Sequence, residues 1–314
     1  MPNVKDLCWG ARSGIQKAIR REDIGLADFC FDLLWNDTKH WQWFVPHRIA
    51  AIVAEDCWQF GGELALTMAH TPKQNDELYK HWRKFILRLA AYPSDKEAAG
   101  LLYLVLNAEK WNIQRTDKEW LALRELCELV KQRLGKPELL SLSADIMPIC
   151  SKYFSRRLTN YENAAVHMYA QRMNPAGWGG FWSDKMTCLA AIVLIYSRGL
   201  VQAEVKKTLQ NALKKQHITR HKDLPWYCYD QHTFVGKRAI KAVLSSTNGI
   251  TQDNLHSLLF LKSSAIIPRP SPMWEEVTQR DLEERFGSLT DAETAWKKYQ
   301  PIVRQKILWS ASLQ

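Results

Sequence analysis

Asp230 and His232 are the two residues of this sequence whose types and spacing best suit acid–base chemistry. A carboxylate close to an imidazole can orient the ring and tune its proton affinity. The same pair is also a common structural hydrogen bond, because buried polar groups need partners. Two interpretations therefore stay open: an enzyme that acts on nucleic acid or a nucleotide beside a basic surface, and a structural contact.

Lysine and arginine are concentrated around this pair, and Asp223 and Asp230 are the only acidic residues of the segment 206–241. Cations with aromatic side chains between them suit the neutralisation of phosphates and the stacking of bases. We therefore predict nucleic-acid binding by this segment; the alternative is a solvated helix face. The predicted binding residues are Lys206, Lys207, Lys214, Lys215, Arg220, Lys222, Trp226, Lys237, Arg238 and Lys241.

The whole chain shares this basic character. Its 314 residues include 43 Lys and Arg against 33 Asp and Glu, which gives a net charge of +10 and a pI near 9.2. A basic surface concentrates polyanions, with nucleic acid first among them. The composition therefore favours nucleic acid as a partner.

A second group of charged residues marks a short apolar helix near the N-terminus. Pro46 suits its first turn, and the apolar residues between 49 and 53 repeat at helical spacing. Arg48 and Glu55 lie seven positions apart and share a face. Glu55 and Asp56 stand at the C-terminal end, where the helix dipole disfavours negative charge. We therefore predict that Arg48, Glu55 and Asp56 form a structural ion-pair cluster.

The order of segments in this part of the chain resembles a known family. Residues 13–21 and 23–34 are similar to a helix pair, 48–56 to an arginine-led helix, and 85–95 to the following helix. In that order these elements are found behind the ATPase core of the RarA/MgsA family of AAA+ proteins. The resemblance covers about residues 10–105, and the ATP-binding half of the family has no counterpart here.

Two positions depart from the family pattern: Ala54 replaces a serine, and Trp58 stands in place of a glycine. The resemblance implies a fold like the clamp-loader collar, assembly into homo-oligomers, and work on DNA alongside replication proteins. We therefore expect a non-catalytic accessory protein of DNA replication or recombination. An aromatic cluster is the expected surface of self-association; it consists of Trp35, Trp41, Trp43 and Phe44.

Motifs for the common catalytic chemistries are missing from the sequence. It contains no P-loop, no dinucleotide-binding glycine pattern, no zinc-protease motif and no nucleophile elbow. Its seven cysteines have no metal-ligand spacing, so we expect reduced, buried thiols and neither a metal nor a cofactor. No apolar run approaches the roughly 18 residues of a membrane span. We expect a cytoplasmic protein without a membrane contact.

Helical periodicity dominates the chain, and no stretch alternates with a period of two. Asp23 is suited to cap one helix, and residues 116–119 form a capping pattern before another. The sequence therefore predicts an all-α fold, a multi-helix orthogonal bundle. We place a boundary between an N-terminal helical domain, 1–135, and a second helical domain, 136–314, which carries the basic segment.

Overall fold

A computed structural model describes residues 4–37, 39–173, 182–215 and 219–312, without the side chains of residues 4–5, 37, 39–47 and 215. The described residues are mostly helical and contain no strand, which confirms the all-α prediction. The first helices are α1 (Val4–Arg20), α2 (Ile24–Asp37), α3 (Lys39–Asp56), α4 (Gly61–Ala69), α5 (Asn75–Ala91), α6 (Glu97–Leu106), α7 (Lys118–Gln132) and α8 (Met147–Tyr153). The later ones are α9 (Asn160–Met173), α10 (Trp182–Arg198), α11 (Gln202–Lys215), α12 (Phe234–Ser246), α13 (Gln252–Leu259), α14 (Pro272–Phe286) and α15 (Leu289–Ser312).

Short turns of 3₁₀ or π type join several of these helices. They are η1 (Trp58–Phe60), η2 (Pro137–Leu139), η3 (Leu142–Ile146), η5 (Trp226–Cys228) and η6 (Phe260–Ser264). Of these turns, η5 packs against α1, and η6 follows α13 directly.

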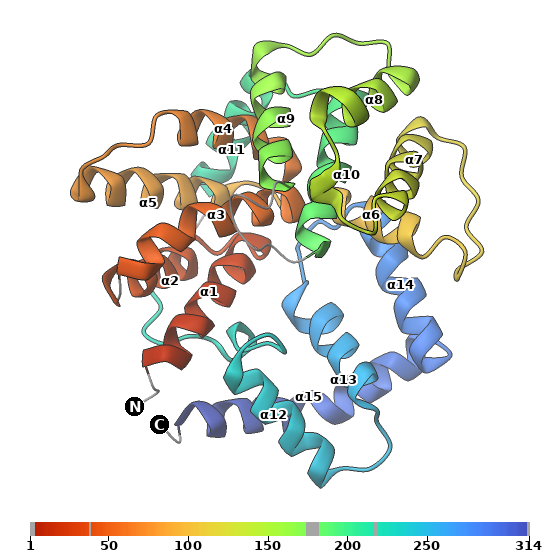
Figure 1. Cartoon of the computed structure of the whole chain (residues 1–314). Coiled ribbons are helices and arrows are strands. Elements are labelled where there is room, and N and C mark those ends of the chain that lie inside the picture. The colour runs from red at the N-terminus through yellow and green to blue at the C-terminus, as the bar shows by residue number, and fades with distance from the viewer. Residues whose placement is uncertain (1–3, 38, 174–181, 216–218, 313–314) are drawn as a thin grey trace.

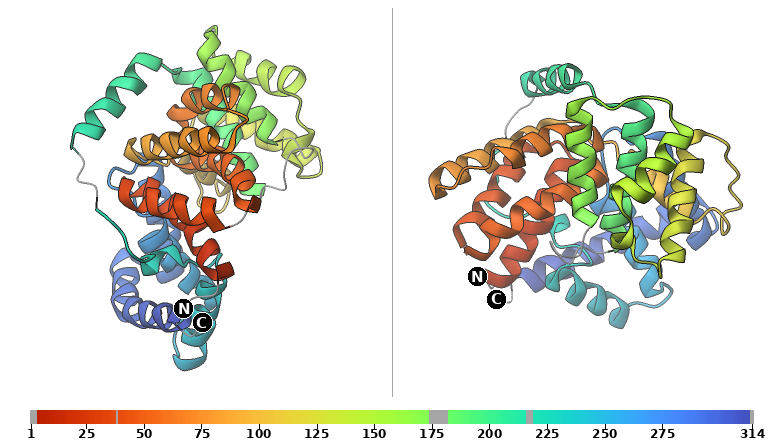
Figure 2. Two further views of the ribbon diagram at one scale, coloured as in Figure 1. Left: turned by 90° about the vertical axis from the view of Figure 1, so that its left-hand side faces the viewer. Right: turned by 45° about the horizontal axis from the view of Figure 1, so that its top comes forward.

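The helices pack around α10, which is buried without interruption from Lys185 to Tyr196. Helices α3, α6, α7 and α9 surround it, and α14 lies against α6 (Figure 1). At the far end, α12 packs on α15, close to the two chain termini (Figure 2). A single cluster of buried apolar side chains runs from Cys8 to Ile307, so helices from both sides of residue 135 share one core. The domain boundary stays a prediction.

Side-chain caps fix the starts of several helices. The Asp23 carboxylate accepts a hydrogen bond from the Leu26 N–H at 2.9 Å, as its position in the sequence predicted. The Asp117 carboxylate likewise caps α7 through the Trp120 N–H. Helix α3 differs from the prediction: it begins at Lys39, so Pro46 lies inside the helix, at the cost of one backbone hydrogen bond.

Among the described residues, no single helix is long and apolar enough to cross a membrane; only the sharply bent pair α10 and α11, taken together, meets that length and composition.

A substitution at Gly236 would test the close packing at the start of α12. A Cβ at this position would lie 1.8 Å from the Asp230 carbonyl oxygen, which is backbone and has no room to move aside. We expect Gly236→Ala to destabilise the protein by about 2–3 kcal/mol, as overpacked cores do. Urea unfolding followed by tryptophan fluorescence measures this. Ser245→Ala, at an exposed position of the same helix, should change stability by less than about 0.5 kcal/mol; equal effects would contradict the close approach.

Candidate functional site

Two acidic residues at the end of α3 form the centre of a buried ion network. Arg20 Nε donates to the Asp56 carboxylate at 2.8 Å, and Arg20 Nη2 donates to Glu55 at 2.6 Å. Lys96 Nζ reaches the same two carboxylates, at 2.6 Å from Glu55 and 3.1 Å from Asp56. Gln16 donates to both as well. Asp56 and Lys96 are completely buried, so this network is part of the protein core.

The predicted cluster of Arg48, Glu55 and Asp56 is only partly correct. Arg48 Nη1 bonds Asp184 of α10 at 3.0 Å, and its Nη2 donates to the Gln16 side-chain oxygen at 2.9 Å. No direct bond to Glu55 or Asp56 is among the described contacts of Arg48. The direct partners of Glu55 come from α1 and from the start of α6.

The charges of this network stabilise one another. Burial opposes the ionisation of Glu55, but the positive charges of Lys96 and Arg20 outweigh it and lower the pKa of this carboxyl below its ordinary value. Burial also opposes the charge of Arg20, and the carboxylates of Asp56 and Glu55 reverse that effect and raise its pKa. These groups therefore stay ionised and paired at neutral pH, as a structural element requires.

Asp230 is held in the same way, and each of its carboxylate oxygens has a partner other than the imidazole of His232. One oxygen pairs with the buried Lys17 ammonium, and the other accepts the backbone N–H of His232 at 3.0 Å. His232 is exposed, yet the packing around its ring lowers its pKa, while the Asp230 charge opposes that shift. The pair thus matches the structural interpretation of the sequence better than the catalytic one.

Arg48 pairs with the carboxylate of Asp184, and the charges of Arg172 and Arg12 also act on the pKa of that carboxyl. Arg12 extends from α1, Arg48 from α3 and Arg172 from the end of α9, and all three are half-buried. Burial and the nearby charge of Arg48 lower the pKa of Arg12 to about 10, and Asp184 opposes the shift. The pKa of Arg172 is lowered in the same manner, mainly by burial.

The start of α12 adds to this group. Lys237 is exposed near the start of α12, and its charge, like that of Arg48, helps to lower the pKa of His232. We call Arg12, Arg48, Arg172 and Lys237 the cationic face.

An aromatic pair stands beside the cationic face. The Arg12 guanidinium lies 4.7 Å from the centre of the Trp9 ring, and Trp9 meets Phe234 edge to face with ring centres 5.8 Å apart. Phe234, the first residue of α12, is 42% exposed. Cations next to partly exposed aromatic rings are the combination that single-stranded nucleic acid binders use.

The ten predicted binding residues do not form one surface. Helix α11 packs on α5, whereas α12 packs on α15 and α1, and the two helices lie at opposite ends of the molecule (Figures 1 and 2). Lys206, Lys207 and Lys214 are exposed on α11, and the side chain of Lys215 lies outside the described residues. The charge count along the sequence therefore combined residues of α11 with residues of α12, which lie in different parts of the molecule.

The remaining predicted residues lie on the connection between α11 and α12 or on α12 itself. Arg220 and Lys222 are exposed on the connection, and Trp226 is half-buried with its ring centre 6.2 Å from that of Tyr227. Lys237 and Lys241 are exposed on α12. Arg238 is exposed too, but its charge is paired with Asp6 at 2.8 Å. Of the ten predicted residues, only Lys237 belongs to the cationic face.

Sequence reasoning missed four residues that matter here: Arg12, Arg20, Lys96 and Arg172. A signal was present for two of them, because Arg12, Gln16 and Arg20 recur every four residues and share one stripe of α1. Lys96 and Arg172 carry no such signal, since their partners are far away in the sequence.

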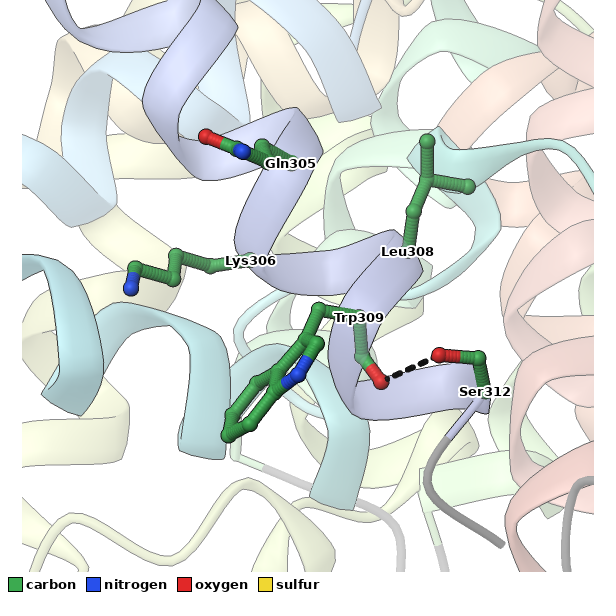
Figure 3. A pocket seen from close by; sticks show the side chains of 5 residues that line it. All are labelled: Gln305, Lys306, Leu308, Trp309 and Ser312. Carbon is green, nitrogen blue, oxygen red and sulfur yellow. Dashed lines mark hydrogen bonds between the residues drawn. The ribbon is translucent and has the colours of Figure 1, made fainter.

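Two surface pockets lie away from this site. One of about 510 Å³ is lined by a single helix, α15, where Lys306, Leu308 and Trp309 project around its last turns (Figure 3). The other, of about 470 Å³, is a mainly apolar groove between η6, α14 and the start of α15. Neither brings together the several polar groups from different elements that orient a bound ligand.

The predicted self-association surface is described only in part. Trp35 is buried and packs against Phe31 with ring centres 5.2 Å apart. The side chains of Trp41, Trp43 and Phe44 lie outside the described residues. All seven cysteines are buried free thiols, as predicted, and the described residues contain no cluster of potential metal ligands.

Comparison with known proteins identifies no relative: no family model, no curated protein and no solved structure matches the chain. The resemblance to the RarA/MgsA family therefore stays a prediction from residues 10–105, and the functional argument rests on the geometry of the site.

The network predicts how stability depends on pH. Because the folded-state pKa of Glu55 is below its unfolded value of 4.5, its contribution is fully present above that value and is lost as the pH falls further. We expect Glu55→Gln to lower stability at pH 7 by about 2 kcal/mol and to flatten the acid dependence below pH 4.5. Urea unfolding at pH 7 and pH 3.5 measures both. Glu128→Gln, in an exposed pair with Lys131, is the control; an unchanged acid dependence in Glu55→Gln would contradict the assignment.

Proposed function

We propose that this protein is a non-catalytic nucleic-acid-binding protein that serves DNA replication or recombination as an accessory factor. The observation that carries the proposal is the Trp9–Phe234 pair with Arg12 against the Trp9 ring, together with the exposed Lys237 on the same helix as Phe234. Phosphates would contact the cations, and exposed bases would stack on the aromatic rings.

The state of the carboxylates supports a binding role over a catalytic one. Glu55, Asp56 and Asp230 are each bonded to a buried lysine or arginine, so none of them is available as a general base. A catalytic carboxylate needs a shifted pKa and access to a substrate. The resemblance to the RarA/MgsA family supports the connection with replication and DNA, and it is the basis for proposing self-association.

The separation of α11 from α12 gives a direct test of the binding surface. We expect Lys237→Ala/Lys241→Ala to weaken binding of a single-stranded DNA and to reduce the slope of log affinity against log salt by about 0.7 for each phosphate that is no longer neutralised. Fluorescence anisotropy at two salt concentrations measures this, and duplex DNA is tested in parallel. Lys207→Ala/Lys214→Ala on α11 is the charge-matched control and should leave the slope nearly unchanged. If the parent protein binds no DNA at low salt, the proposed function is wrong.

Self-association has its own test. By the proposal, the protein forms a homo-oligomer through its N-terminal third, and light scattering at about 50 micromolar, above the range of typical weak affinities, should give a mass that is a multiple of 36.4 kDa. A mass of one chain at this concentration would exclude the oligomer and leave the DNA-binding proposal intact.

A further inference from the structure

The last turns of α15 expose a tryptophan although the inner face of this helix is already packed. Tyr299, Val303 and Ile307 belong to the buried face of α15. Trp309 and Leu308 lie outside that face and are 55% and 49% exposed. A large aromatic ring gains most from being covered, so a tryptophan left in water suits a contact with a partner.

The ring of Trp309 forms part of the hollow of about 510 Å³ on α15 (Figure 3). Gln305, Lys306 and Ser312 supply polar groups around it, and the Lys306 ammonium lies 5.9 Å from the centre of the ring. Groups from a single helix do not orient a small ligand by convergent hydrogen bonds. A flat ring with a cation beside it is sufficient, however, for stacking of a nucleobase, which tolerates any base because every base has a flat face.

Positive charge surrounds this ring on α15 and on α12, which packs against α15. The sequence contains no Asp or Glu in residues 231–252 or 294–314, which include α12 and most of α15. Among the described residues, the one ion pair of these two stretches joins Arg238 to Asp6. The other basic side chains are Lys237, Lys241, Lys297, Lys298, Arg304 and Lys306. Their charge favours a polyanion as the partner of this surface.

Helix α15 is held against both ends of α12, so it offers a rigid support. The Tyr299 hydroxyl donates to the Asn248 carbonyl, just beyond the end of α12, at 3.1 Å, and α15 also contacts η5, which precedes α12. On α15, Lys298 and Gln305 share the stripe of Trp309, because the three residues recur at helical spacing. Lys298 lies about 16 Å before Trp309 along the helix axis. A strand stacked on Trp309 can therefore extend along this stripe.

We infer that Trp309 is a base-stacking platform for single-stranded nucleic acid, and that Lys306 and Lys298 bind the adjoining phosphates. This inference rests on the proposed function and adds a second contact, on α15, to the Trp9–Phe234 pair. It favours a single strand over a duplex, because the bases inside a duplex are already stacked on one another and do not offer their faces to a side chain.

An anionic membrane is a different partner for cations beside a tryptophan, and the packing of α15 argues against it. A helix that lies on a membrane buries a broad apolar face among the lipids. The apolar face of α15 is already buried within the protein, and outside it the last turns expose only Leu308 and Trp309 among the large apolar side chains described there. Nucleic acid requires no more than a ring and a row of cations.

The experiment compares two fluorescent strands of one length by anisotropy: oligothymidine, and an abasic strand that keeps the sugars and phosphates. We expect Trp309→Ala to weaken binding of oligothymidine about tenfold and binding of the abasic strand less than about twofold, because only the first strand can stack. Trp309→Tyr, which keeps a ring, should stay within about threefold of the parent. Trp182→Ala, at an exposed tryptophan of α10, is the control and should bind both strands like the parent.

A measurement on the parent protein alone locates the strand without any variant. A strand that contains bromodeoxyuridine is photo-crosslinked to the protein, and the tryptic peptides are analysed by mass spectrometry. We expect a crosslink to the peptide that begins at Ile307, after cleavage at Lys306, and contains Trp309. Crosslinks to other peptides without one to this peptide would overturn the inference.

The phosphate contacts have a separate readout. Lys298→Ala/Lys306→Ala should reduce the slope of log affinity against log salt by about 0.7 for each phosphate that is no longer neutralised, whereas Trp309→Ala removes no charge and should keep the slope. An unchanged slope in the double variant would overturn the assignment of the strand to this stripe of α15.

The remaining outcomes separate this inference from the proposed function. If the parent binds DNA and Trp309→Ala binds oligothymidine equally well, or loses both strands to the same degree, the stacking platform is wrong and the proposed function remains in place. A parent that binds no DNA disproves both. Binding of the parent to phosphatidylserine vesicles without any DNA binding would assign the ring and its cations to a membrane surface instead.

Discussion

The fully buried carboxylate of Asp56 is the constraint on which the rest of the structure depends. A buried charge without partners is prohibitively unfavourable, and here the C-terminal end of α3 adds its own negative potential. Arg20 and Lys96 neutralise the side chain, and the Asp56 carbonyl accepts hydrogen bonds from the Ser94 hydroxyl and the Asp95 N–H. Satisfying one acidic residue therefore fixes α1, the end of α3 and the turn before α6 relative to one another.

The cations of this network also contact the C-terminal helices. Arg20 also donates to the Ser264 carbonyl of η6, and the Lys96 ammonium lies 4.4 Å from the centre of the Trp274 ring on α14. Two side chains thus join the C-terminal helices to the N-terminal ones. The same geometry creates the cationic face, because the stripe of α1 that places Arg20 in the core places Arg12, two turns earlier, at the border with solvent. One face of α1 therefore contributes Arg20 to the interior network and Arg12 to the proposed binding surface.

The sequence predicts the local features of this protein well and its long-range pairings poorly. Helical periodicity and the Asp23 cap depend on neighbours within four residues, so pattern alone reveals them. Lys17 and Asp230 are 213 positions apart, and nothing in either segment specifies the other. The charges of the basic segment 206–241 do not form one surface for a related reason: they are close in sequence, but α11 packs on α5 and α12 packs on α15.

Lys96 illustrates how tertiary contacts override local preference. It precedes α6 with a φ of 53°, in the left-handed region that costs a side-chain-bearing residue about 1–2 kcal/mol and that glycine would occupy more easily. The left-handed turn brings the Lys96 N–H and the ammonium of the same residue to Asp56, one to its carbonyl and the other to its carboxylate. A glycine would relieve the backbone and leave Glu55 and Asp56 with one cation fewer in a dry interior, which is the larger cost. The lysine is therefore explained by the buried carboxylates, just as the arrangement of α1 is.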